Sequence, residues 1–114
     1  MHVEANGIKM NCALSGPESA PVVVCSHCLA GSLDIWEPQL SALEKKYRVL
    51  RYDTRGHGGT SAPDSAYDMA MLASDAAGLM SALNIDSCHF VGISMGGMIG
   101  QTLALTHPER VSSL

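Results

Sequence analysis

The residues with the clearest chemical potential are Gly92-Ile93-Ser94-Met95-Gly96, which form a G-x-S-x-G pattern. An apolar, β-rich run (residues 88–92) precedes the serine, and a helix-forming run (residues 95–106) follows it. In this setting the chain turns sharply from strand into helix, so the serine is held in a strained conformation with its hydroxyl projecting. The pattern predicts that Ser94 is a nucleophile. The alternative is a glycine-rich turn that contains a serine by chance.

A serine nucleophile needs hydrogen-bond donors for the oxyanion that forms when it attacks a carbonyl. The start of the helix supplies free N–H groups and the positive end of its dipole, so the backbone N–H of Met95 is one candidate. The loop of residues 26–31 follows a strand of three valines and could present a second N–H, that of Leu29. Within this loop we expect His27 to fix the backbone rather than to act as a general base. Trp36 either lines the entrance of a substrate pocket or simply packs.

A second polar loop, Asp53-Thr54-Arg55-Gly56-His57-Gly58, follows the next predicted strand. Its residue types favour a structural role, in which Asp53 caps a turn and Arg55 pairs with a neighbouring carboxylate. The glycines would supply positive φ angles. The less favoured interpretation makes His57 a catalytic base.

Cys25-Ser26-His27-Cys28 is a C-x-x-C pattern, which raises the alternative of a redox or metal site. Zinc sites usually add a second pair at similar spacing, whereas Cys12 and Cys88 are isolated. A thioredoxin-like pair should open a helix, and here a loop follows. We therefore expect Cys25 to be a small buried apolar residue and expect no metal.

Composition narrows the class of protein. The chain has 114 residues, of which 46% are hydrophobic and 16% charged, and its formal net charge is −4. This balance excludes a disordered tail, and it argues against a nucleic-acid or anionic-membrane partner. No apolar stretch approaches the ~20 residues of a spanning helix, and the N-terminus does not read as a signal peptide. The expected location is cytoplasmic, with reduced cysteines.

The chain alternates between strand-like and helix-like segments, which is typical of an α/β sheet. Helix 95–106 carries glycines at positions 96 and 100, so it should lie very close to the central strands. The last predicted strand begins just where the sequence ends, and we expect the chain to be the N-terminal piece of something longer. The predicted strands are 7–14, 21–25, 47–52, 88–92 and 110–114, and the predicted helices are 38–46, 69–83 and 95–106.

Three segments together resemble the α/β-hydrolase superfamily: residues 26–31, residues 52–58 and residues 90–97. Within it the chain most resembles the 3-oxoadipate enol-lactonases, through residues 51–58, Leu33-Asp34-Ile35-Trp36 and residues 89–101. Many superfamily members have glycine where this chain has Cys28, and the lactonases tolerate another residue there.

The resemblance implies an α/β-hydrolase fold, of which residues 1–114 form the N-terminal half. A mostly parallel sheet would be flanked by helices and cut before its later strands. It also implies a triad in the order Ser, acid, His. The acid and the histidine would lie beyond Leu114, so the chain alone should have little activity. Ser94 would attack a small-molecule ester or lactone while Met95 and Leu29 hold the oxyanion, with no cofactor.

Other activities of the same fold stay open at this point. They are carboxylester hydrolysis, C–C bond hydrolysis and cofactor-free haloperoxidation. A non-catalytic relative that binds a small molecule is a further alternative, although it would not need a strained serine. A nucleotide-binding protein is disfavoured because Gly56-His57-Gly58-Gly59-Thr60-Ser61 does not match G-x-G-x-x-G. The oligomeric state is left open.

Overall fold

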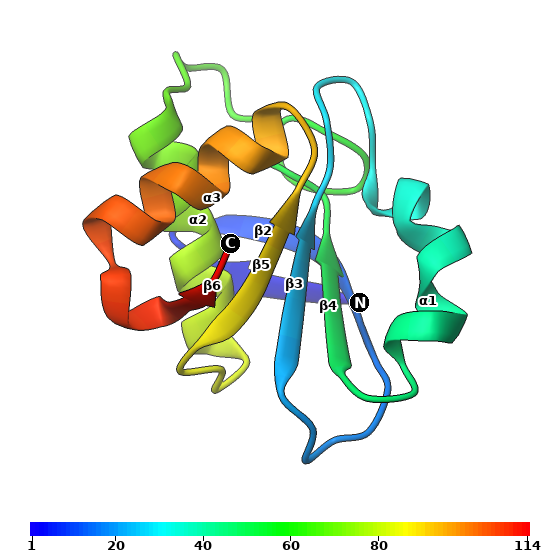
Figure 1. The fold of residues 1–114 in the computed structure, drawn as a ribbon. Helices are drawn as coiled ribbons and strands as arrows, with labels where there is room; N and C mark the ends of the chain where they lie inside the picture. The colour runs from blue at the N-terminus through cyan, green and yellow to red at the C-terminus, as the bar shows by residue number, and fades with distance from the viewer.

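A computed structural model describes all 114 residues and shows a six-stranded sheet with helices on both faces (Figure 1). The strand order is β1-β2-β4-β3-β5-β6. The strands are β1 His2–Ala5, β2 Ile8–Ser15, β3 Val22–Ser26, β4 Arg48–Tyr52, β5 Cys88–Gly92 and β6 Val111–Ser113. The α-helices are α1 Glu37–Leu43, α2 Met69–Ala82 and α3 Met95–Thr106, and the 3₁₀ helices are η1 Leu33–Trp36 and η2 Pro108–Arg110.

The sheet is parallel only from β4 through β3 and β5 to β6. Its other edge is an antiparallel hairpin, in which β1 pairs with β2 and β2 pairs with β4. The predicted mostly parallel sheet is confirmed, and the antiparallel hairpin forms one edge of it. Asn6 and Gly7 both have positive φ, 49° and 77°. Such a two-residue turn reverses the chain between two antiparallel strands, so that residues 2–5 pair with β2 as strand β1. This strand was not predicted.

Alternate residues of β3 enter two different cores, which explains its run of valines. Val24 faces α2 and α3 and belongs to the larger core cluster. Val23 and Cys25 face α1 and belong to a smaller cluster with Val49 and Trp36. Burial on both faces makes β3 a fixed central strand, and the loop that follows it starts from a rigid base.

The predicted boundaries of β5 and α3 are confirmed, and α2 ends one residue early. Asp68 caps α2 as predicted, since its side chain accepts a hydrogen bond of 2.8 Å from the Met71 N–H. Helix α1 is shorter than predicted and ends at Leu43. The short helices η1 and η2 were not predicted. No helix has the length and apolar character needed to cross a membrane.

Helix α3 lies close against the strands at Gly96 and Gly100, as predicted. A Cβ at Gly96 would fall on the backbone carbonyl of Ser26, at the end of β3. A Cβ at Gly100 would lie 2.6 Å from the Phe90 ring. The absence of side chains at both positions lets the start of α3 meet the carboxyl ends of β3 and β5.

Candidate active site

Ser94 occupies the sharp turn between β5 and α3. Its backbone angles are φ 55° and ψ −114°, which a residue with a side chain rarely adopts. The residue is exposed, and its side chain does not cap the helix. Strained residues of this kind cost about 1–3 kcal/mol each and concentrate at functional sites. The hydroxyl is therefore held outward at the carboxyl edge of the sheet.

The glycines that flank Ser94 are required by close backbone contacts. A Cβ at Gly92 would collide with the backbone of Gly96 and Gly97. A Cβ at Gly96 would collide with the Ser26 carbonyl. The turn can be this tight only because both positions lack a side chain, as the G-x-S-x-G pattern predicted.

The two predicted oxyanion donors have N–H groups without acceptors. Neither the Met95 N–H at the start of α3 nor the Leu29 N–H donates to a backbone or side-chain group. The loop that carries Leu29 begins beside the elbow, because Ser26 pairs with Gly92 across β3 and β5. The Ile93 N–H also donates to the Ser26 carbonyl, at 3.2 Å. The structure thus brings the loop of residues 26–31 and the elbow together at the carboxyl ends of β3 and β5. The oxyanion role of the two N–H groups stays a prediction.

His27 is fully buried and both of its ring nitrogens are engaged. Nε2 lies 2.9 Å from the Thr54 N–H, and Nδ1 lies 2.7 Å from the Cys28 carbonyl oxygen. Burial lowers the pKa of His27 and the nearby His57 lowers it further, against the opposing effects of the Cys28 bond and the Asp53 charge. A neutral ring with a hydrogen bond at each nitrogen suits the predicted loop-fixing role and leaves no nitrogen for a general base.

Asp53 holds the start of η1, which follows the loop of residues 26–31. Its carboxylate accepts from the Leu33 N–H at 2.7 Å, and from the Gly59 N–H and the Asn11 side-chain amide at 2.8 Å each. Burial acts to raise the pKa of Asp53, but these hydrogen bonds outweigh it and lower the pKa below the usual value. Asp53 is thus an ionised anchor, in line with the structural role predicted for its loop.

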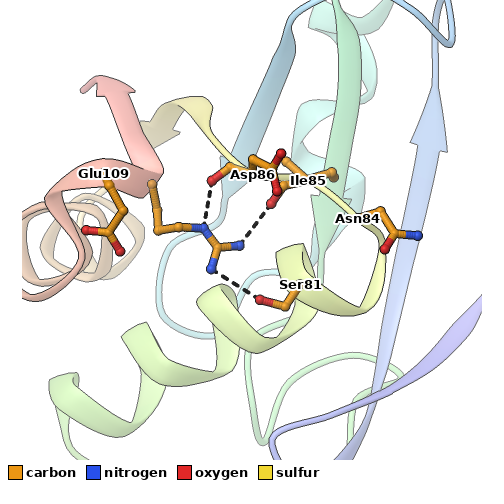
Figure 2. Close-up of a pocket in the computed structure, with 6 residues that line it drawn as sticks. Ser81, Asn84, Ile85, Asp86 and Glu109 are labelled. Atoms are coloured by element: carbon orange, nitrogen blue, oxygen red, sulfur yellow. Dashed lines mark hydrogen bonds between the residues drawn. The ribbon is translucent and has the colours of Figure 1, made fainter.

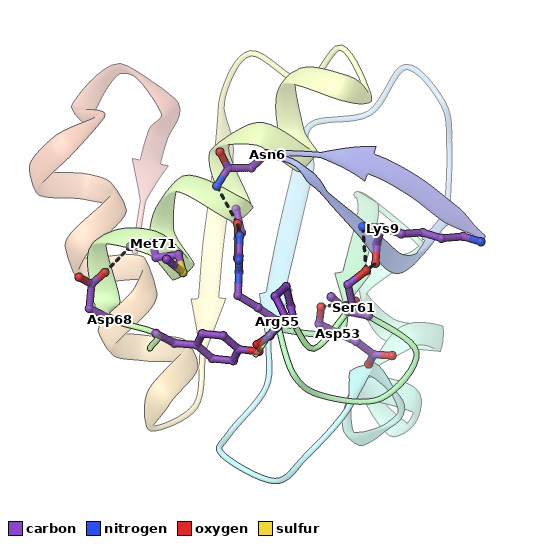
Figure 3. A network of polar contacts seen from close by, with 11 residues as sticks. Asn6, Lys9, Asp53, Arg55, Ser61, Asp68 and Met71 are labelled. Atoms are coloured by element: carbon purple, nitrogen blue, oxygen red, sulfur yellow. Dashed lines mark hydrogen bonds and ion pairs between the residues drawn. The ribbon is translucent and has the colours of Figure 1, made fainter. Parts of the chain in front are cut away.

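Arg55 anchors the loop of residues 53–58 to helix α2 (Figure 3). Its guanidinium makes two hydrogen bonds to the buried Asp75 carboxylate of α2, at 2.8 and 2.7 Å. The Asn6 side chain donates to the same carboxylate at 2.7 Å, so the β1–β2 turn joins the network. Gly56 and Gly58 have φ values of 80° and 49°, which confirms the predicted use of glycine here.

Neither Trp36 nor His57 makes a hydrogen bond to Ser94. Trp36 is 6% exposed and packs in the smaller core cluster below α1, so the structure favours the packing interpretation. Its assignment to a substrate pocket stays a prediction. The His57 Nδ1 lies 3.1 Å from the Arg55 carbonyl oxygen, and its ring centroid lies 5.1 Å from that of His27. The contact with the Arg55 carbonyl ties His57 to its own loop.

The C-x-x-C pattern does not have the properties of a redox pair. All four cysteines are free thiols, and only Cys28 is partly exposed. Burial raises the pKa of Cys25 to about 11, so this thiol is rarely ionised at neutral pH. Since the thiolate is the reactive form, Cys25 behaves as the small buried residue that was predicted.

A cavity of about 520 Å³, drawn close up in Figure 2, lies near the start of β5, whereas Ser94 follows the end of that strand. It adjoins the loop before β5, whereas ligands of open α/β sheets bind at the carboxyl ends of the strands. The Arg110 guanidinium there donates to the carbonyls of Asp86 and Ile85 and to the Ser81 hydroxyl, which ties η2 to α2. The lining residues, none of them singled out from the sequence, are Ser81, Asn84, Ile85, Asp86, Glu109 and Arg110.

Comparison with known protein families identifies the fold. A family model described as "alpha/beta hydrolase fold" matches residues 21–114. The chain belongs to this family. The predicted α/β-hydrolase fold is thereby confirmed, and so is the resemblance to enol-lactonases. Two curated relatives illustrate this. 3-Oxoadipate enol-lactonase 2 of Acinetobacter baylyi is 38% identical over 110 residues. A putative carbamate hydrolase, RutD, of Serratia proteamaculans is 47% identical over 100 residues.

Solved structures of this family superpose closely on the chain. The enol-lactonase from Burkholderia xenovorans has a TM-score of 0.95 and 42% identity, covering 97% of this chain and 44% of that one. Epoxide hydrolase A from Mycobacterium thermoresistibile has a TM-score of 0.93 and 33% identity, covering 98% and 36%. The curated relatives are likewise longer: the matches cover 96% of this chain and 41% of the lactonase, and 83% of this chain and 36% of the carbamate hydrolase.

Proposed function

We propose that the full-length protein is a serine hydrolase that cleaves a carboxylic ester or lactone, with 3-oxoadipate enol-lactone, an intermediate of aromatic catabolism, as its substrate. The observation that carries the proposal is the exposed Ser94 at positive φ, beside the unpartnered N–H of Met95. A binding protein has no need of that strained conformation. The lactone is favoured because relatives named enol-lactonases match 96% of the chain at 38% identity.

In the proposed reaction the Ser94 oxygen attacks the lactone carbonyl, and the carbonyl oxygen becomes an oxyanion held by the N–H groups of Met95 and Leu29. The C–O bond to the enol oxygen then breaks, which leaves an acyl group on Ser94. The freed enol oxygen stays on the same acyl chain and takes up the proton that the base removed from Ser94, and the enol then tautomerises to a ketone, which draws ring opening forward. Water hydrolyses the acyl-enzyme and restores the serine.

The serine proton needs a base, and the proposal places this base and its acidic partner outside residues 1–114. His27 has both ring nitrogens engaged, and no histidine in the structure hydrogen-bonds to Ser94. We therefore expect residues 1–114 alone to show little hydrolytic activity. A cytoplasmic location is part of the proposal, and the four free cysteines of residues 1–114 are in keeping with a reducing compartment.

Hydrolysis of a carbamate is the second candidate function. The supporting observation is the 47% identity to a putative carbamate hydrolase, which exceeds the identity to the lactonase above. The same serine and oxyanion donors would serve, because a carbamate carbonyl passes through a similar tetrahedral intermediate. The two candidates therefore differ in the leaving group and not in the elbow.

Labelling of the full-length protein with a fluorophosphonate tests the shared chemistry. We expect one phosphonate on Ser94, with labelling lost in Ser94→Ala and kept in the control Ser87→Ala, another exposed serine. The substrate is then decided by comparing kcat/KM for 3-oxoadipate enol-lactone with that for a small carbamate. Absence of label on Ser94 in a folded protein would overturn the hydrolase proposal and favour a non-catalytic binder.

A further inference from the structure

The direction of the Leu29 N–H is set by the peptide that joins it to Cys28. Residues 28–31 form a tight turn, in which the Gly31 N–H donates to the Cys28 carbonyl at 3.0 Å and Ala30 has φ 63°. The chain has no cis peptide bond, so the Cys28 carbonyl and the Leu29 N–H point in opposite directions. Whatever holds the Cys28 carbonyl therefore also decides where the Leu29 N–H points.

His27 connects that carbonyl to the sheet. The backbone N–H of Thr54 can only donate, so the Nε2 atom that it meets at 2.9 Å must be an acceptor. The ring proton then lies on Nδ1, which donates to the Cys28 carbonyl at 2.7 Å. Thr54 is itself buried two residues after the end of β4, in the loop that Asp53 and Arg55 anchor. The ring thus ties the turn of residues 28–31 to a fixed point at the end of β4.

We infer that His27 is a positioning residue for catalysis: through its Nδ1–H tautomer it orients the Cys28–Leu29 peptide so that the Leu29 N–H serves as an oxyanion donor. This inference rests on the proposed function of Ser94. The oxyanion exists only during the reaction, so a misdirected Leu29 N–H lowers kcat and leaves substrate binding largely unchanged. Removing one oxyanion donor costs about 100- to 1,000-fold in rate, and misplacing it costs less.

Two substitutions in the full-length protein each break one link of this connection. His27→Asn keeps a donor near Nδ1 and loses the acceptor for Thr54, whereas His27→Gln keeps a group near Nε2 and loses the donor to Cys28. With 4-nitrophenyl acetate as probe, we expect kcat to fall about 10- to 100-fold in both, with KM within about threefold of the wild type. The matched control is Leu79→Ala, which destabilises the buried core of α2 without touching the loop.

The inference is overturned if kcat of both His27 variants stays within about threefold of the wild type, or falls no further than in Leu79→Ala. A second readout does not depend on activity. Cys28 is the partly exposed cysteine of the described chain, and its alkylation by iodoacetamide can be followed by mass spectrometry. We expect alkylation about tenfold faster or more in the His27 variants, and unchanged in the control, because loop opening exposes the thiol.

These measurements separate the two proposals. If the wild-type protein hydrolyses no ester and Ser94 takes no phosphonate, the proposed function fails, and the alkylation rates alone test the role of His27 in the turn. Equal alkylation of wild type and variants then overturns that role. If Ser94 is labelled and the His27 variants retain full kcat, the hydrolase proposal stands and the positioning role is rejected.

Discussion

Replacing Ser94 with glycine should make the protein more stable than replacing it with alanine, although both variants lose the proposed nucleophile. Alanine keeps a Cβ at φ 55° and ψ −114° and therefore keeps the strain. Glycine adopts these angles freely, and the strain that it relieves is about 1–3 kcal/mol. Against this stands the extra freedom of glycine in the unfolded chain, about 0.5–1 kcal/mol. The Ser94→Gly variant should thus be more stable than Ser94→Ala by up to about 2.5 kcal/mol.

The assay is urea unfolding of both variants, followed by circular dichroism and extrapolated to water. Ser41 provides the control, because it is exposed in the middle of α1 with an ordinary helical backbone. At that position glycine should be about 1 kcal/mol less stable than alanine. The diagnostic result is this reversal of sign between positions 41 and 94. If alanine is the more stable residue at both positions, Ser94 is not strained and the argument for a nucleophile elbow is refuted.

Three further predictions concern the packing and charges around the elbow. Gly96→Ala should cost about 3 kcal/mol or more of unfolding free energy, whereas Gly97→Ala, whose Cβ meets only ordinary contacts, should gain about 0.5–1 kcal/mol in the same urea assay. Arg55→Leu should cost about 3–5 kcal/mol by calorimetry and urea unfolding, because the Asp75 carboxylate stays buried without its cation. An unchanged stability would show that the pair is dispensable.

The lowered pKa of His27 also predicts a pH dependence. Below the ordinary value of 6.5 the unfolded chain takes up a proton that the native ring resists, so stability should fall as the pH drops from 6.5 toward the native pKa. Urea unfolding at several pH values measures the slope, and His27→Asn should remove this contribution. A slope that is the same in the variant would contradict it.

The local elements were predictable because each has its own signal in the chain. The run of valines in β3 and the apolar spacing of α2 specify those elements without long-range information, and Asp68 marks where α2 begins. The strand order was not predictable, because it depends on which strands pair. The hairpin of β1 and β2 was missed although Asn6-Gly7 signals a turn, because the four residues of β1 are too short to show a pattern.

At the site, Ser94 could be identified because the sharp turn around it requires glycine at positions 92 and 96, and both glycines are visible in the sequence. The anchoring bonds were not, because they join residues far apart along the chain. The contact between the Thr54 N–H and His27 spans 27 positions, and that between Asn6 and Asp75 spans 69. No local pattern distinguishes a histidine that meets a backbone N–H from one that is free to exchange protons. A loop-fixing role of His27 could be expected from the sequence, but the two contacts that support it are seen only in the structure.

The elbow depends on close contacts of the main chain, since a Cβ at Gly92 would collide with the backbone of Gly96 and Gly97, and one at Gly96 with the backbone of Ser26. Side chains in the neighbouring loops can therefore change without disturbing the conformation of this turn. This separation explains how proteins named as lactonases, carbamate hydrolases and epoxide hydrolases share the framework of this chain at 33–47% identity. For protein engineering it means that new specificities can be sought in the neighbouring loops while the elbow itself is left untouched.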